Sequence, residues 1–472
     1  MMYWHKIQEY IRKYSFLILV LEILGCIAAI VCICNNRTLH WDEAYTFQMV
    51  TTNTVPQIIY QTGQDIHPPL YYLLLKLVIT VFGSGFIVFK LFSVGCTAAV
   101  MILGVTMIRK HWGNKVAFLF IPAVGLGPQF IYFAVDMRMY GLQLFFVTYC
   151  ALLAYEIFKH DRNRDWVLFT LSALGGAYTH YFAIVPLALI YGFLLIDLVI
   201  KNKKSIKKFL LCSIATILGY LPWVFTMLRS FVAMGTTGEI NLVQFDLKDL
   251  CEWMFSTNIE FSVIMGVTLF AVAWLVFGMH KNSLEFEQKL FLIMCGMNSF
   301  LSYTFCVLVA SLNSHFWDNR YIYGSITMLW LFIFICITRW QKAAFYSLSC
   351  WLVIMVLSSY RIQTAKELGT NGYVDAAYAV LEQVKDEDVI IYNYPTYQVL
   401  YGAHLPDKEF VFIDDVDFEE FDKDYVYMIS WGGAWFSDEI VDRYQLKTQN
   451  CGEMRFEEGM AGMVLYKISF QR

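Results

Sequence analysis

The stretch HWDEAYTF (His40–Phe47) places two adjacent carboxylates just beyond a long apolar run. That run, Phe16 to Ile33, is long enough to cross a bilayer and is preceded by basic residues. Asp42 and Glu43 therefore lie where the chain has just left the membrane, and we expect them to face water. An acidic pair at a membrane face is costly to place and is a candidate functional site by default.

The composition of the 472 residues is that of a polytopic membrane protein. Hydrophobic residues make up 58% of the chain and charged residues 16%, which is more apolar surface than a water-soluble globule needs. The net charge of −4 gives no sign of nucleic-acid binding. The twelve cysteines lie almost all in apolar runs without CxxC spacing, which argues against a zinc cluster or a disulfide framework.

Apolar segments long enough to span recur along the chain as far as Tyr360. They predict about eleven transmembrane helices, at residues 16–34, 87–108, 116–135, 140–158, 166–179, 181–200, 209–228, 259–279, 290–311, 321–338 and 343–360. The two segments between Asp165 and Lys201 share too few residues, so at least one of them is short or broken.

The polar connections between these segments form a basic set and a second set, and the two sets alternate along the chain. One kind is basic, and the positive-inside rule places it in the cytoplasm: Arg109 and Lys110 with Lys115, Lys159 with Arg162 and Arg164, the run KNKKSIKK at Lys201–Lys208, Lys281 with Lys289, and Arg339 with Lys342. This arrangement predicts a multi-pass protein of the plasma membrane with its N-terminus in the cytoplasm and its C-terminus outside.

The apolar run from Pro68 to Phe82 does not fit this alternation as a span. A crossing here would invert every later loop, and at about 1.5 Å per residue the run is too short to cross comfortably. We therefore expect a helix that lies along the outer interface, with Pro68 or Pro69 in its first turn.

The composition changes after Tyr360, where acidic side chains outnumber basic ones. Strand-like runs alternate with helical patterns, which predicts a small α/β domain with a partly parallel sheet. The strand candidates are DVIIYN, EFVFID, YVYMISW and MVLYKISF, and the helical patterns are Val374–Val384 and Asp438–Tyr444. We expect two domains: a transmembrane domain at 1–360, whose first outer loop is 35–86, and an extracytoplasmic domain at 361–472.

In this topology, polar segments from distant parts of the sequence gather on the outer face. They are Asp65 with His67, AVDMRMYGLQ (Ala134–Gln143), GAYTHYFA (Gly176–Ala183) and NSHFWDNRYIYG (Asn313–Gly324), and they carry Asp136, Arg138, His180, His315, Asp318 and Arg320. Ordinary explanations exist for single residues: an ion pair at a helix end, an interfacial anchor, or a snorkelling arginine. The convergence of all of them on one face favours a functional site.

The order of DE, HPPLYY, RMYGL and YTHYFA resembles the GT-C type membrane glycosyltransferases. It is most similar to their family-39-like branch, which includes protein O-mannosyltransferases and the transferase that adds aminoarabinose to lipid A. Members carry an acidic residue or pair in the first outer loop, a [H/K]PPL segment after it, and an arginine at the turn between the third and fourth spans. The resemblance covers residues 10–230 well and the remainder loosely. It implies a polytopic α-helical GT-C-like fold with outer juxtamembrane helices.

The resemblance further implies an inverting transferase of cell-envelope glycosylation, which moves a sugar from a polyprenyl-phosphate donor to an acceptor hydroxyl outside the membrane. A carboxylate must take the proton of the acceptor, which suits Asp42, while Glu43 orients a substrate or tunes its neighbour. The leaving phosphate gathers negative charge, so we expect it to bind Arg138, His180 and Arg320. Further substrate contacts are expected from His67, Asp136, Tyr140 and Tyr181.

Other functions stay open. A transporter or flippase of lipid-linked sugars has many spans too, but the chain shows no inverted repeat and its charges lie at the boundary. A polymerase or ligase of surface polysaccharide would carry a very large outer loop, and a scaffold leaves the DE and RMYGL motifs unexplained.

His67, Asp65 and Glu43 are ligand types that suit a divalent ion, but their spacing is not diagnostic, so we assign no metal ligand. Mannose is the commonest sugar by resemblance, and the acceptor is a protein, a wall polymer or a lipid glycan.

Overall fold

The computed structural model describes residues 13–36, 41–65, 67–201, 203–234, 260–312, 319–340, 344–367, 379–393, 395–402, 408–430, 436–454 and 463–471. The chain forms two compact units. The first contains Met1–Asn35 and Thr54–Gln363, and the second contains Asn36–Asn53 together with Thr364–Arg472. The segment that carries Asp42 and Glu43 therefore belongs to the same unit as the C-terminal residues.

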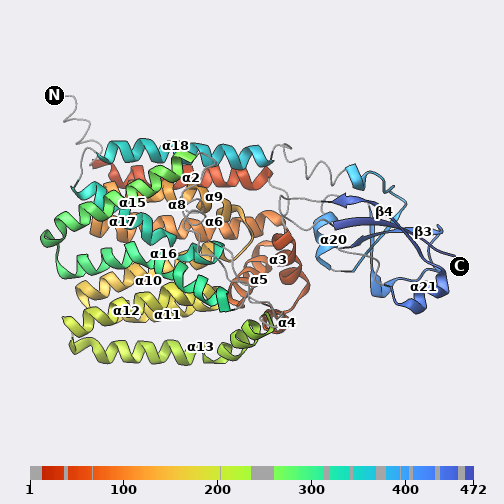
Figure 1. Ribbon diagram of the computed structural model, residues 1–472, viewed down its shortest axis with the longest axis horizontal. Coiled ribbons are helices and arrows are strands. Elements are labelled where there is room, and N and C mark those ends of the chain that lie inside the picture. Colours follow the sequence, from red (N-terminus) through yellow and green to blue (C-terminus); the bar gives the residue numbers. More distant parts are fainter. Residues whose placement is uncertain are drawn as a thin grey trace. The chain divides into compact units, whose positions relative to one another are not determined.

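The first unit is a bundle of helices, most of which run side by side (Figure 1). Its elements in chain order are α2 (Ser15–Asn36), α4 (Val55–Thr62), α5 (Leu70–Phe82), α6 (Phe86–Leu103), η1 (Gly104–Ile108), α7 (Arg109–Trp112), α8 (Asn114–Leu126), α9 (Pro128–Val135), α10 (Tyr140–His160), α11 (Asn163–Thr179), η2 (Tyr181–Ala183), α12 (Ile184–Ile200), η3 (Lys203–Ser205), α13 (Ile206–Met234), α15 (Glu260–His280), η4 (Lys281–Ser283), α16 (Phe286–Leu312), η5 (Asn319–Ser325), α17 (Ile326–Trp340) and α18 (Ala344–Glu367).

The described residues of the predicted apolar segments are almost all helical, and the chain is a multi-pass membrane protein. Within the described residues, eight helices are long and apolar enough to cross a membrane, and the bent pair α8 and α9 adds a ninth. The predicted number of about eleven is therefore not reached by this measure. Helix α11 has only 17 residues and is separated from the 3-10 turn η2 by the single residue His180. This agrees with the expectation that one segment between Asp165 and Lys201 is short.

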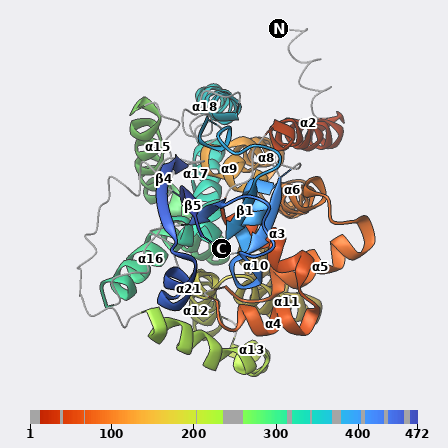
Figure 2. The same ribbon diagram turned by 90° about the vertical axis from the view of Figure 1, so that its right-hand side faces the viewer.

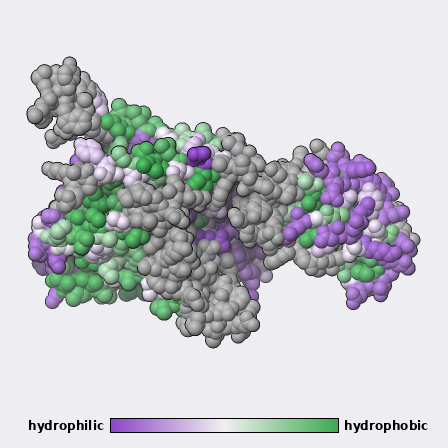
Figure 3. Space-filling view, turned by 45° about the horizontal axis from the view of Figure 1, so that its top comes forward, coloured by the Kyte–Doolittle hydropathy of each residue, from purple (hydrophilic) through white to green (hydrophobic). Residues whose placement is uncertain are grey.

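The helices differ in how deeply they are buried, as expected for a bundle in lipid. The span that contains α17 is 94% buried, whereas the span that contains α13 is only 17% buried. Helices α18 and α13 lie at opposite edges of the bundle in both views (Figures 1 and 2). Apolar side chains cover much of the described bundle surface (Figure 3), and Phe225 on α13 is 75% exposed. Such a surface is stable against lipid tails and not against water.

The pair α8 and α9 bends by 54° at Gly127. A Cβ atom on Gly127 would lie 2.3 Å from the carbonyl oxygen of Ala123, so only glycine fits this break. Pro128 then occupies the first turn of α9, where its missing N–H costs no hydrogen bond. The break sets the direction of α9 and therefore the position of the turn after it, which carries Asp136 and Arg138.

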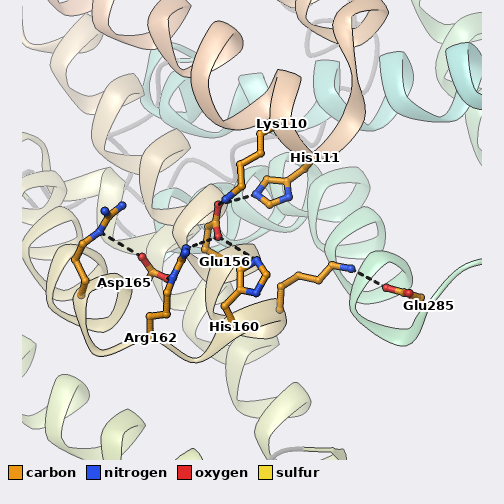
Figure 4. A network of polar contacts seen from close by, with 9 residues as sticks. Lys110, His111, Glu156, His160, Arg162, Asp165 and Glu285 are labelled. Carbon is orange, nitrogen blue, oxygen red and sulfur yellow. Dashed lines mark hydrogen bonds and ion pairs between the residues drawn. The ribbon is translucent and has the colours of Figure 1, made fainter.

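The basic connections gather at one end of the bundle, around the buried carboxylate of Glu156 (Figure 4). Its oxygens lie 2.5 Å from Lys110 Nζ, 2.7 Å from His111 Nε2 and 2.6 Å from Arg162 Nη2. Further ion pairs at this end join Lys159 to Glu285, Lys201 to Glu287 and Lys208 to Asp161. Loops that the positive-inside rule assigns to one side of the membrane therefore do lie together.

The second unit contains a five-stranded mixed sheet of order β2-β1-β3-β5-β4. Its strands are β1 (Val389–Tyr392), β2 (Glu409–Phe412), β3 (Tyr425–Ser430), β4 (Lys447–Met454) and β5 (Met463–Ser469). Strand β1 pairs in parallel with β2 and β3, while β5 pairs antiparallel with β3 and β4. The partly parallel sheet of the prediction is confirmed.

Other elements described in this unit are α3 (Trp41–Thr52), α20 (Pro395–Gly402), η6 (Ile413–Asp415) and α21 (Asp438–Tyr444). Its core joins Ile391, Phe418, Met428 and Ile468, all at most 2% exposed. Helix α3 packs against α20. The helical pattern predicted at Val374–Val384 lies partly outside the described residues, which resume at 379, and residues 379–381 are helical.

Candidate functional site

The centre of the candidate site is Arg138, which lies in the turn after α9 and is 3% exposed. Its Nη1 lies 3.3 Å from the hydroxyl oxygen of Tyr72 on α5, and its Nη2 lies 3.4 Å from Nε2 of His67. The motifs HPPLYY and RMYGL, which are far apart in the sequence, therefore meet at this guanidinium group. Pro69 is the N-cap residue of α5, so the double proline sets where this helix begins beside Arg138.

The contacts of His67 determine the position of its proton. Arginine can only donate hydrogen bonds, so Nε2 of His67 must be the acceptor from Arg138. The proton of a neutral ring then lies on Nδ1, which is 3.4 Å from Oδ2 of Asp65. Asp65, His67 and Arg138 therefore form a chain of hydrogen bonds that orients the guanidinium group. In this state His67 positions Arg138 from the protein side.

His180 lies between α11 and η2, with an extended backbone that separates the two helices. Its ring centroid is 5.7 Å from that of His67 and 5.9 Å from that of Tyr140. Nδ1 accepts a hydrogen bond of 3.2 Å from the backbone N–H of Phe182, so the neutral ring carries its proton on Nε2. Among the described residues this buried Nε2 has no hydrogen-bond partner.

The surroundings of His180 keep its ring neutral. Burial away from water lowers the pKa of His180 well below its ordinary value of 6.5, and the nearby positive charges of Arg138 and Arg320 lower it further. A neutral His180 presents one N–H group from Nε2. Such a group can donate a hydrogen bond to an anionic oxygen without adding a second buried charge to that of Arg138.

The remaining predicted residues of this unit lie around the same centre. Arg320 on η5 lies over the ring of Tyr321, which is 5.6 Å from the His180 ring. Asp136 is 6% exposed and follows the last residue of α9. The hydroxyl of Tyr181 accepts a hydrogen bond of 3.1 Å from Nε1 of Trp223, so Tyr181 is joined to α13.

Asp42 and Glu43 lie in the first turn of α3, in the second unit. The sequence predicts that both carboxylates face water, and for Glu43 this is wrong. Glu43 is 0% exposed, while Asp42 is half-buried. Carboxylates in a first helical turn interact favourably with the helix dipole, which is a local reason for the helix to begin here.

Some predicted features lie beyond what the structure describes, and two residues were missed. His315 and Asp318 are outside the described residues. Tyr72 was not predicted as a site residue although it is the last letter of HPPLYY, and Tyr321 follows Arg320 directly. Among the described residues no three His, Cys, Asp or Glu side chains form a metal-ligand group. Asp65 and His67 contact each other, and Glu43 belongs to the second unit.

Comparisons with known proteins agree with the motifs. Residues 66–225 match the family described as dolichyl-phosphate-mannose-protein mannosyltransferase. The crystal structure of ArnT from Cupriavidus metallidurans bound to undecaprenyl phosphate is similar, with a TM-score of 0.58 over 95% of this chain and 97% of that chain. Its apo structure has a TM-score of 0.59 over the same shares, and both are 11% identical in sequence. A search of curated proteins finds no match to the chain.

The structural likeness extends over nearly the whole chain. It therefore reaches well past residues 10–230, where the motifs carry the resemblance. The chain has the fold of the GT-C type membrane glycosyltransferases, with a small C-terminal sheet domain, and its predicted resemblance to them is confirmed.

Proposed function

We propose that this protein is an inverting glycosyltransferase that moves a sugar from a polyprenyl-phosphate donor to an acceptor hydroxyl at the outer face of the plasma membrane. The observation that supports this best is the cluster of hydrogen-bond donors formed by the buried Arg138 and His180 and the half-buried Arg320 at one end of the bundle. Positive charge and N–H groups in a water-poor site suit a leaving phosphate, because its charge grows in the transition state.

Each residue has a distinct role in the proposal. Arg138 binds the phosphate with two parallel donors, and His67 with Asp65 holds it in place. His180 adds a neutral donor and Arg320 a second charge. His67 and Tyr140 border the sugar, as do Asp136 and Tyr181.

Asp42 is the proposed general base, which takes the proton of the acceptor hydroxyl as the new bond to the anomeric carbon forms. Glu43 orients the substrate beside it. A single base and direct displacement of the phosphate invert the configuration at the anomeric carbon.

The family that matches residues 66–225 is described by its mannosyl donor and protein acceptor, and ArnT was solved with undecaprenyl phosphate. We propose a polyprenyl phosphate as the lipid carrier and mannose as the first sugar to test, with other hexoses and pentoses after it. The proposed orientation has the N-terminus in the cytoplasm and the C-terminal residues outside.

The decisive experiment is transfer by the purified protein in detergent, where no membrane gradient exists. We expect a glycosylated acceptor by mass spectrometry when polyprenyl-phosphate mannose and an extract of surface glycans are supplied. Comparison of surface glycans between a deletion strain and its parent identifies the sugar and acceptor. Movement of lipid-linked sugar across vesicles without any transfer in detergent contradicts the enzyme and supports a flippase.

A further inference from the structure

A pocket of about 430 Å³ lies between α17 and the turn that joins α7 to α8. Its lining includes residues 111–116 together with Thr338 and Arg339 of α17. Helices α8 and α17 pack against each other, so two neighbouring helices hold the pocket in shape. The described residues of the lining include three basic side chains, His111, Lys115 and Arg339, and no acidic one.

The pocket lies at the end of the bundle opposite to Arg138. His111 in its lining is hydrogen-bonded at 2.7 Å to Glu156, in the network of Figure 4. Glu156 is near the last residue of α10, whereas Tyr140, whose ring neighbours that of His180, is the first. The two positions are about 24 Å apart at 1.5 Å per residue. The pocket is therefore separate from the candidate phosphate site.

Two exposed cations from different helices line this one cavity. They are Lys115 on α8 and Arg339 on α17. Among the described residues Lys115 forms no ion pair, and its ammonium group lies 4.8 Å from the centroid of the Phe345 ring. A single anionic group in the pocket can contact both cations, and hydrogen bonds between ionised partners are the strong ones.

Hydrogen-bond donors in the lining add to this charge. Nε1 of Trp112 is buried and has no hydrogen-bond partner among the described residues. Gly113 is the N-cap residue of α8, and no side chain of the described residues caps this turn. The first backbone N–H groups of a helix have no partner within the helix. An anionic oxygen would satisfy such donors, which are costly to leave unpaired.

The pocket lies at the depth expected for lipid head groups. The candidate spans Phe86–Trp112 and Arg320–Arg339 both end at residues that line it. Phe345, whose ring contacts Lys115, begins a third span that is only 28% buried. This span belongs to α18, which lies at the edge of the bundle in both views (Figures 1 and 2). A lipid at this edge can place its head group in the pocket while its tails stay in the bilayer.

We propose that this pocket binds the head-group phosphate of an anionic phospholipid. Lys115 and Arg339 contact the phosphate, and Trp112 and the first turn of α8 donate hydrogen bonds to it. In the orientation proposed above, the lipid belongs to the cytoplasmic leaflet. The inference does not depend on sugar transfer, because the pocket is far from Arg138. A soluble phosphate compound has the same chemistry and is the competing ligand.

The test compares lipids that differ in charge. The purified full-length protein is titrated in detergent with phosphatidylglycerol or phosphatidylcholine, and bound lipid is counted by native mass spectrometry. We expect phosphatidylglycerol to bind about tenfold more tightly, because each basic side chain near a lipid surface favours anionic lipid. The double variant Lys115→Gln with Arg339→Gln should reduce this preference to less than about twofold.

The control removes the same charge elsewhere at this end of the bundle. Lys203→Gln with Lys204→Gln changes two exposed lysines that do not line the pocket, so the preference should remain. If both double variants lower the preference equally, the attraction is diffuse and the pocket is not the site.

A second pair of variants tests the cavity while leaving every charge in place. Asn114→Trp fills the pocket from the exposed first residue of α8, and should lower the preference as the charge variant does. Asn163→Trp places the same ring on the exposed first residue of α11, outside the pocket, and should change nothing. Unaltered lipid binding by Asn114→Trp would overturn the proposal.

The source of the phosphate is decided by competition. Glycerophosphoglycerol is the head group of phosphatidylglycerol without its tails, and we expect an equal concentration of it to displace little of the lipid. Full displacement at equal concentration would assign the pocket to a soluble phosphate compound and overturn the lipid proposal.

Discussion

Nη2 of Arg138 lies 3.4 Å from Nε2 of His67, although 71 positions separate the two residues in the sequence. Because the guanidinium group can only donate, this single contact fixes the neutral tautomer of His67 and turns its other nitrogen toward Asp65. The guanidinium group of the candidate phosphate site is therefore held by hydrogen bonds that link the HPPLYY motif to the RMYGL motif.

Arg138→Lys should keep the positive charge but remove the two parallel donors. We expect transfer to slow by about 10- to 1,000-fold because bidentate contact with the phosphate is lost. Arg164→Lys is the matched control, since its side chain is 78% exposed at the other end of the bundle. A merely structural Arg138 predicts less folded protein with normal activity per folded molecule.

Asp42→Asn should remove the proton acceptor while preserving size. We expect transfer to fall by about 100- to 10,000-fold, the usual contribution of a general base. Glu43→Gln should cost less if Glu43 only orients the substrate. The reverse result exchanges the two roles, and activity in both variants moves the base elsewhere, with Asp136 the next candidate.

The buried His180 should make folding stability depend on pH. Its pKa in the folded protein lies well below the ordinary 6.5, so at a pH just below 6.5 the unfolded chain binds a proton that the folded chain does not. The free energy of unfolding should therefore fall as the pH falls through about 6.5, by up to about 1.4 kcal/mol per pH unit from this residue.

This effect is measured by comparing denaturant unfolding of the wild type and His180→Gln across that pH window in detergent. Titrating groups far from the site contribute equally to both proteins, so the difference between the two slopes of unfolding free energy against pH reports His180 and its neighbour His67. Equal slopes would show that His180 protonates in the folded state as easily as in the unfolded state.

Glu156→Gln should destabilise the bundle without changing the chemistry. Glu156 is 2% exposed and accepts hydrogen bonds from Lys110, His111 and Arg162, so its loss should cost about 1–3 kcal/mol. The control is Glu285→Gln, whose side chain is 65% exposed and whose ion pair should contribute less than about 1 kcal/mol. Thermal unfolding measures both, and equal losses would mean that burial does not strengthen the network.

Membrane orientation is tested by labelling cysteines in intact cells. Cys451 is a free, half-buried thiol in the second unit and should react with an impermeant maleimide. Lys204→Cys, in the basic connection before α13, should react only after the membrane is permeabilised. Cys451→Ser supplies the background. Labelling at position 204 from outside would reverse the predicted topology.

The sequence predicted the helices and most strands because their patterns are local. The helix predicted at Asp438–Tyr444 is α21 with the same bounds. Strand β4 was missed, since its residues KTQNCGEM are mostly polar and mostly exposed at the edge of the sheet. An edge strand of this kind is specified by its partner β5 and has no alternating apolar pattern of its own.

The candidate site was predicted only in part, because the sequence gives the topology but not the contacts between side chains. Topology alone places His67, Arg138, His180 and Arg320 at one end of the bundle, and the structure brings their side chains together. The tautomers of the two histidines depend on contacts of a few ångströms, which no spacing in the sequence encodes. The burial of Glu43 likewise depends on tertiary packing and not on its neighbours in the chain.

The packing of α3 against α20 has a consequence for biosynthesis. Residues 41–52 leave the ribosome early, whereas α20 begins only at Pro395. At about 5–20 residues per second, the interval is about 20–70 s. During that time the bundle is inserted while the helix with Asp42 and Glu43 lacks its packing partner. A chain that terminates prematurely before Pro395 would therefore contain all the membrane helices of the described residues and still lack a completed second unit around its acidic pair.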